Sequence, residues 1–178
     1  GILPSKWYGV PDAPARDRVT WCTHEVECTM ADITRLARDE DAPYKSLYYD
    51  IETLGLEPEH SEIIQVSLVI RQGEAKRKYL VCVGAHDPIE GVIVTEAATE
   101  HDLLIAFRRV VVEEDPDFVV AYNGVNFDNR FLAVRAERLG ADEAFYLSRF
   151  LLRPCRLRDL RLKSSGMGDN LLRYFDMV

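Results

Sequence analysis

The chain has 178 residues, of which 47% are apolar and 29% are charged, and its formal net charge is −8. These values are typical of one globular domain, with or without an extension, that buries a hydrophobic core. No stretch approaches the roughly 20 apolar residues of a membrane-spanning helix, so we expect no membrane partner. The acidic balance argues against broad non-specific binding to nucleic acid, which needs a basic surface.

The first part of the chain predicts an irregular extension, residues 1–44, ahead of a domain at 45–178. Three prolines interrupt its beginning and disfavour regular structure there. A helical pattern first occurs over 30–38, where Thr29 is the expected cap and Asp32 stands in the capping-box position.

The domain begins with a series of predicted strands. Residues 46–53 are rich in β-branched and aromatic side chains, which favours a strand. The run 63–71 alternates apolar and polar residues, and Gly73 then marks a turn. Residues 78–83 therefore predict a third strand, antiparallel to the second. A short fourth strand or sheet edge is expected at 92–95.

Two helical patterns follow, separated by one more strand. Thr99 is the expected cap of a helix that runs to about Glu114 with an apolar stripe on one side. The apolar run 118–122 is short enough for a buried strand. The second helix is predicted over about 127–139 and ends at Gly140.

The pattern weakens toward the C-terminus. Residues 144–152 predict a helix, and the segments 156–163 and 171–176 both alternate, with turn-rich sequence between them. We expect an extended C-terminal β-hairpin that carries basic side chains on one arm. The complete order predicts an α/β fold, with a mixed sheet and helices on its faces.

Two carboxylates stand near the end of the first predicted strand. Because side chains alternate along a strand, Asp50 and Glu52 project from one face and Ile51 from the other, into the core. Two adjacent acids repel each other, which raises their pKa values unless something neutralises them. Mg²⁺ or Mn²⁺ would do so, because hard cations prefer oxygen ligands. Tyr49 is expected to pack within the sheet rather than to take part in chemistry.

A third carboxylate belongs to the same predicted edge of the sheet. If the strand at 118–122 lies beside the first strand, Asp128 comes to the edge that carries Asp50 and Glu52. We therefore expect these three carboxylates within a few ångströms of one another. Taken alone, Asp128 is equally well explained as an acid at a helix N-terminus, where the helix dipole favours negative charge.

Taken together, two short motifs resemble a known family. The sequence D-I-E at 50–52, followed by N-G-V-N-F-D at 123–128, resembles the first two exonuclease motifs of family B DNA polymerases. Either motif alone is weak evidence, whereas the pair at this spacing is strong. The likeness is greatest to delta-type and large-virus polymerases, covers residues 46–178, and implies a ribonuclease H-like exonuclease fold.

The resemblance also implies a reaction and a role for each acid. The reaction is metal-assisted hydrolysis of the terminal phosphodiester at a DNA 3′ end, as in proofreading. Two Mg²⁺ or Mn²⁺ ions about 4 Å apart would hold the attacking water and the departing oxygen. Asp50 would bridge both ions, Glu52 would bind one and orient the water, and Asp128 would hold the second.

The resemblance further implies DNA contacts at a single-stranded or frayed end, which has less pairing to lose. Phe127 would stack on bases, a contact worth about 1–3 kcal/mol per base, although it could also belong to the core. Asn123 would position the terminal nucleotide. Arg156 and Arg158, on the basic arm of the hairpin, are DNA-contact candidates, but a solvated face is an equal alternative.

One departure from the family concerns its third motif, Y-x-x-x-D. Four residues after Tyr174 stands Val178, not aspartate. We therefore expect a fragment of a proofreading polymerase, partnered by the remaining polymerase domains, in the nucleus or at a viral replication site. Alone, the fragment should bind metal weakly and have little or no nuclease activity.

Two alternatives from other classes remain open. A stand-alone DEDD-type 3′–5′ exonuclease acting on RNA shares the acids, although the N-x-x-x-F-D form and the N-terminal extension favour the polymerase. A non-catalytic module that binds single-stranded DNA or a partner protein is compatible with the missing third motif, whereas the three retained acids count against it. Titration with Mg²⁺ or Mn²⁺ separates the module from the nuclease.

Overall fold

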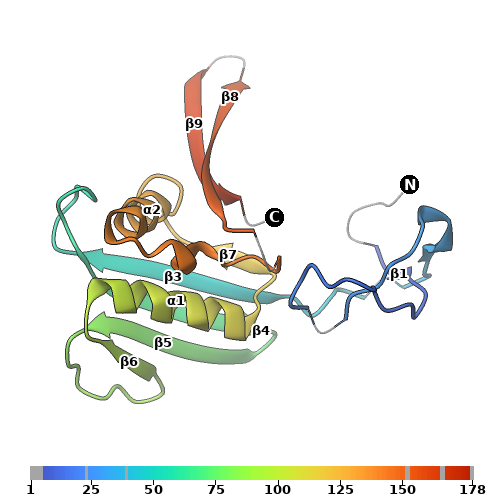
Figure 1. Cartoon of the computed structure of the whole chain (residues 1–178), viewed down its shortest axis with the longest axis horizontal. Coiled ribbons are helices and arrows are strands. Elements are labelled where there is room, and N and C mark those ends of the chain that lie inside the picture. Colours follow the sequence, from blue (N-terminus) through green and yellow to red (C-terminus); the bar gives the residue numbers. More distant parts are fainter. Residues whose placement is uncertain (1–5, 23, 39, 151–152, 165–166, 177–178) are drawn as a thin grey trace.

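The computed structural model describes residues 6–22, 24–38, 40–150, 153–164 and 167–176, and side chains as far as residue 158. Its centre is a five-stranded mixed sheet in the order β6-β5-β4-β3-β7 (Figure 1). None of the helices in these ranges is long and apolar enough to cross a membrane. The strands of the sheet are β3 (Lys45–Thr53), β4 (Ile63–Gln72), β5 (Ala75–Val83), β6 (Ile93–Ala97) and β7 (Phe118–Val120).

The pairing of the strands confirms the antiparallel third strand and the predicted place of the strand at 118–122 beside the first strand. Strand β4 is antiparallel to β5, as the turn at Gly73 indicated, and it is also antiparallel to β3. Strand β6 runs parallel to β5, and β7 runs parallel to β3 with Leu47 opposite Val119. The strand that precedes the second motif therefore lies beside the strand that carries the first.

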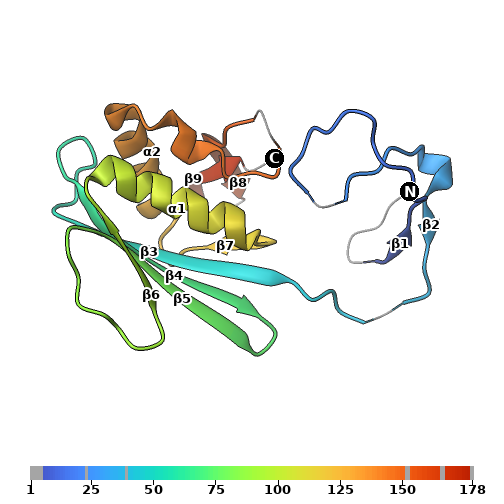
Figure 2. The same ribbon diagram turned by 60° about the horizontal axis from the view of Figure 1, so that its bottom comes forward.

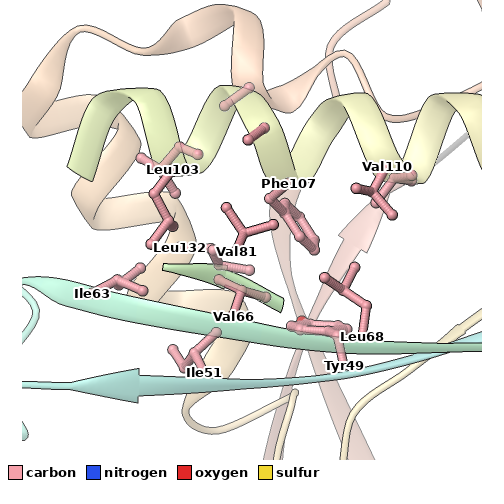
Figure 3. Close-up of a cluster of buried hydrophobic side chains, with 14 of the residues drawn as sticks. Tyr49, Ile51, Ile63, Val66, Leu68, Val81, Leu103, Phe107, Val110 and Leu132 are labelled. Carbon is pink, nitrogen blue, oxygen red and sulfur yellow. The ribbon is translucent and has the colours of Figure 1, made fainter. Parts of the chain in front are cut away.

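Both long helices cover the same face of the sheet. They are α1 (Glu100–Glu114), which begins after the cap Thr99, and α2 (Asp128–Leu139), which ends at Gly140 (Figures 1 and 2). The core lies between them and the sheet, where Phe107 of α1 and Leu132 of α2 face Tyr49 and Val66 (Figure 3). The predicted mixed sheet with helices packed on it is thus confirmed, and in the described ranges both long helices lie on one face (Figure 2).

The opposite face of the sheet carries exposed apolar side chains. Phe118 and Val120 of β7 are 50% and 41% exposed, and Tyr48 of β3 is 43% exposed. The prediction of a buried strand here is therefore wrong. Strand β7 is at the edge of the sheet. The side chains of its first and last residues, Phe118 and Val120, point away from the helices, while the side chain of Val119 packs against the core.

The N-terminal extension is mostly irregular, but its predicted helix is wrong. A 3₁₀ turn, η1 (Met30–Asp32), is followed by Ile33 in extended conformation. The short strand β2 (Thr34–Arg35) then pairs antiparallel with β1 (Tyr8–Gly9). This pairing requires extended backbone inside the segment 30–38, where a helix was expected. The predicted capping contact does form, since the Asp32 carboxylate accepts from the backbone N–H of Thr29 at 2.9 Å.

Trp21 of the extension makes two hydrogen bonds to the domain. The backbone N–H of Trp21 donates to the carbonyl of Arg149 at 3.0 Å, and its indole Nε1–H donates to the carbonyl of Ser148 at 2.8 Å. The guanidinium of Arg149 pairs in turn with Asp115 and Asp117, at the end of α1 and the start of β7. Arg149 thus links Trp21 of the extension to the segment between α1 and β7.

The C-terminal part confirms the hairpin but not the expected helix. Instead of a helix over 144–152 there is a short 3₁₀ turn, η2 (Asp142–Phe145), and residues 151–152 are outside the described ranges. Strands β8 (Arg156–Ser164) and β9 (Met167–Asp176) pair antiparallel and extend beyond the sheet next to α2 (Figure 1).

A buried ion pair ties the two helices together. Arg135 of α2 and Glu100 of α1 are each 7% exposed. They form two hydrogen bonds, Nε to Oε1 at 2.8 Å and Nη2 to Oε2 at 2.5 Å. The same Glu100 Oε1 accepts from the N–H of Ile63, and Arg135 Nη1 donates to the carbonyl of Pro58. This cluster fixes α2 relative to α1 and to the loop that follows β3.

Candidate active site

Strand β3 supplies two of the three predicted carboxylates. Its burial alternates as expected, with Tyr49 and Ile51 buried on the helix side and Asp50 and Glu52 exposed on the other. The prediction that the two acids share a face away from the core is therefore confirmed. The period of two along a strand is sufficient to explain this placement.

The third acid reaches the sheet through a tight turn between β7 and α2. Beyond Val120 the chain turns, and the carbonyl of Asn123 accepts from the N–H of Phe127 at 2.9 Å. A side chain on Gly124 would place its Cβ 2.9 Å from the Cβ of Ala121, so the turn needs glycine at this position. The turn brings the start of α2, residue Asp128, back to β3.

Asp128 is buried against the backbone of β3, with only 2% of its surface exposed. Its carboxylate accepts a hydrogen bond from the N–H of Ile51, beyond the point where β7 ends. Burial raises the pKa of the Asp128 carboxyl, and the negative charge of Asp50 raises it further; hydrogen bonds from its own N–H and from Ile51 act in the opposite direction. The buried acid is therefore held against a neighbouring carboxylate.

The three acids are only partly brought together. Asp50 lies close enough to Asp128 to shift its pKa, as predicted from the strand order. Throughout the described ranges, however, no group of three or more His, Cys, Asp or Glu side chains is arranged to hold a metal ion. The expected convergence of Asp50, Glu52 and Asp128 is thus not found. Its physical reason is that Asp128 is buried beside a backbone N–H while the other two project into solvent.

The remaining predicted site residues lie on separate elements. Asn123 is exposed in the turn before α2. Phe127 is half-buried, and its ring packs on Phe131 with 5.1 Å between the ring centroids. It therefore does belong to the edge of the core, and stacking on a base stays a prediction. Arg156 and Arg158 are exposed on β8, an element different from those of the carboxylates.

One contact in this region was not predicted from the sequence. The hydroxyl of Tyr49 donates to Oδ1 of Asn129 at 2.5 Å, linking the residue before Asp50 to the residue after Asp128. Burial raises the pKa of Tyr49, and the charges of Asp128 and then Asp50 add to that shift. The ring also packs on Phe107, as expected for a strand residue. The only signal in the sequence was a tyrosine at a core position, since a buried phenol needs a hydrogen-bond partner.

The raised pKa of Asp128 predicts how stability changes with pH. A carboxyl whose pKa is higher in the folded state favours folding most below its unfolded pKa, and this contribution is lost as pH rises through the folded value. Asp128→Asn removes the buried charge but keeps an oxygen that can accept from Ile51. We expect the variant to melt at a higher temperature than wild type at pH 7 in EDTA, with the difference shrinking toward pH 3. An equal or lower melting temperature of Asp128→Asn at pH 7 would contradict a raised pKa of Asp128 in the folded chain.

Comparison with known proteins gives consistent matches. A sequence model described as DNA polymerase family B, exonuclease domain, matches residues 1–163. The DNA polymerase delta catalytic subunit of Dictyostelium discoideum is 33% identical over 98% of this chain, and that of rice, Oryza sativa subsp. japonica, is 32% identical over 94%. The DNA polymerase catalytic subunit of Equine herpesvirus 2 is 34% identical over 78%. The chain covers 16%, 16% and 15% of these three proteins, about a sixth of their length.

Proposed function

Because the chain belongs to the exonuclease-domain family of the family B DNA polymerases, we propose that it removes nucleotides from the 3′ end of DNA by hydrolysing the terminal phosphodiester. The observation that carries this proposal is the position of Asp128 beside Asp50. The parallel pairing of β7 with β3, followed by the turn at Gly124, produces that position. Two acids from distant parts of the chain thereby meet at one edge of the sheet.

The chemistry of the acids fits a divalent cation. Asp50, Glu52 and Asp128 offer carboxylate oxygens, the donors that Mg²⁺ and Mn²⁺ prefer. The pKa of Asp128 is raised partly by the charge of Asp50, and a cation between them would relieve that repulsion. We propose that these three residues hold two ions in the complete site. When bound, such ions stabilise charge on the phosphate and lower the pKa of the attacking water.

The chain's own side chains have separate tasks in this mechanism. Glu52, exposed at the end of β3, would accept a hydrogen bond from the attacking water and orient it. Asn123, exposed in the turn before α2, would bind the terminal nucleotide. The uncovered part of Phe127 would contact a base, while its packing on Phe131 keeps the ring in place. Arg156 and Arg158 would pair with phosphates of the strand.

The domain would work as one part of a longer polymerase. We propose that residues 1–44 belong to the region preceding the exonuclease domain and residues 45–178 to the domain itself. The parent would correct its own errors, because a mispaired 3′ end frays more readily than a paired one. Its site of action would be the nucleus or a viral replication site, since the relatives are polymerases of eukaryotes and herpesviruses.

A primer-degradation assay tests this function. The polymerase that carries this domain is incubated without nucleotides on 5′-labelled DNA, either single-stranded, paired or with a mismatched 3′ end. We expect stepwise shortening from the 3′ end in Mg²⁺, faster for the mismatched and single-stranded ends, and none in EDTA. The 178-residue chain alone should show little activity. Absence of shortening in both Mg²⁺ and Mn²⁺ by the polymerase would refute the proposal, and a preference for RNA would favour a ribonuclease.

A non-catalytic role has one observation in its favour, the lack of a three-acid cluster in the described ranges. A module of this kind would bind single-stranded DNA or a protein without needing metal. Titration of the chain with Mn²⁺, followed by electron paramagnetic resonance, separates the two functions. Binding in the micromolar to millimolar range that Asp50→Asn weakens supports the nuclease. No binding at millimolar Mn²⁺, combined with metal-independent DNA binding, supports the module.

A further inference from the structure

We infer that Tyr49 and Asn129 form a positioning pair that holds Asp128 in register with Asp50; this inference rests on the proposed nuclease function for its purpose. The hydroxyl of Tyr49 donates to Oδ1 of Asn129 at 2.5 Å. Tyr49 directly precedes Asp50, and Asn129 directly follows Asp128. The bond therefore joins the two acidic motifs through the nearest neighbours of their acids.

Tyr49 provides a fixed point on the sheet side of this link. Its side chain is 6% exposed and belongs to β3, which is paired with β4 on one side and β7 on the other. Its ring lies in the buried layer beneath Phe107 of α1 (Figure 3), with 5.5 Å between the ring centroids. A ring confined by a sheet and a helix can move little, so its hydroxyl has a defined position.

Asn129 is held from two directions in the first turn of α2. Its backbone N–H donates to the carbonyl of Gly124 at 2.9 Å, and its side chain accepts from Tyr49. The side chain thus attaches the turn before α2 to the strand of the first motif.

A buried ion pair restrains α2 further along the helix. Arg135 joins Glu100 seven residues beyond Asp128, about two helical turns away. It fixes the body of α2, whereas the first turn also depends on the Tyr49–Asn129 bond. Loss of that bond would let the first turn shift and weaken the contact between the Asp128 carboxylate and the N–H of Ile51. Tyr49 and Asn129 touch no reacting atom in this scheme, so they are positioning residues.

The test compares two variants that each remove one tyrosine hydroxyl. Tyr49→Phe keeps the buried ring and deletes the bond to Asn129. Tyr79→Phe is the matched control, because its hydroxyl donates to Glu114 at the far end of α1. The first readout is hydrogen exchange of the Ile51 amide in the 178-residue chain, measured by NMR. We expect exchange on the order of tenfold faster in Tyr49→Phe and unchanged in Tyr79→Phe, although both variants should melt at a lower temperature.

A double variant and an activity measurement complete the test. Asn129→Ala should speed exchange of the Ile51 amide as Tyr49→Phe does. The double variant should exchange little faster than either single variant, because both substitutions remove the same hydrogen bond. In the polymerase, Tyr49→Phe should lower kcat for 3′ hydrolysis about tenfold with little change in KM, as loss of an outer support of a metal ligand does. Unchanged Ile51 exchange in Tyr49→Phe would overturn the inference whether or not the protein is a nuclease. If Tyr49→Phe speeds exchange of the Ile51 amide but the polymerase that carries this domain does not shorten DNA, the positioning inference stands and the proposed function is refuted.

Discussion

Asp50→Asn is expected to abolish 3′ hydrolysis by the polymerase that carries this domain while its DNA synthesis continues. The substitution keeps the size of the side chain and removes its charge, and Asp50 is exposed, so the fold should not change. The loss should be on the order of 10³-fold, because metal-assisted stabilisation of the transition state contributes several kcal/mol. The measurement is the rate of primer shortening in Mg²⁺ beside the rate of primer extension on the same DNA.

A matched control for this result is Asp87→Asn, the same chemical change at an exposed acid in the loop before β6. It should leave both rates within about twofold of wild type, as is usual for surface substitutions remote from a site. Asp128→Asn should resemble Asp50→Asn in activity. It should differ in stability, because Asp128 is buried and Asp50 is not. If Asp50→Asn retained wild-type hydrolysis, the assignment of the site to this edge of the sheet would be wrong.

Arg135→Ala is expected to produce the largest loss of stability. It removes one partner of a buried ion pair and leaves the Glu100 carboxylate without its guanidinium, which typically costs about 3–5 kcal/mol in the free energy of unfolding. It also removes the donor to the carbonyl of Pro58. Urea denaturation followed by circular dichroism measures the change.

Arg130→Ala is the control for that measurement, because Arg130 also lies on α2 and pairs with a carboxylate, that of Glu59, at 2.9 Å. Both of these side chains are more than a third exposed, and such pairs contribute about 1 kcal/mol or less. Replacing both members of the buried pair, as Glu100→Gln with Arg135→Met, should recover part of the loss. Position 100 would then still accept from the N–H of Ile63. Equal losses for Arg135→Ala and Arg130→Ala would contradict the role given to the buried pair.

Local periodicity was enough to predict most elements of the domain and the orientation of the acids on β3. It placed Asp50 and Glu52 on one face and Ile51 in the core, because that placement depends only on alternation along a strand. The order of the strands also followed from simple connection rules, and it predicted the approach of Asp128 to Asp50.

Features that depend on distant partners could not be predicted in the same way. An apolar run at 118–120 does not say whether its strand is central or at an edge, and β7 proved to be an edge strand with two exposed side chains. Arg135 has the sequence appearance of a surface residue, and only Glu100, 35 positions away, makes it a buried one. The hydroxyl of Tyr49 likewise finds its acceptor 80 positions away. Each of these contacts is fixed by the packing of whole elements.

The parallel pairing of β3 with β7 has a consequence for the order of folding. Ser46 meets Phe118 across 72 positions of chain, whereas β3, β4 and β5 are joined by short loops. Contacts between distant positions form late, because the entropy of the intervening segment opposes them until local structure has formed. A nascent chain would therefore complete its three-stranded meander, with Asp50 and Glu52 in place, before Asp128 arrives. A half-folded domain would therefore display two of the acids while the third is still absent from the edge of the sheet.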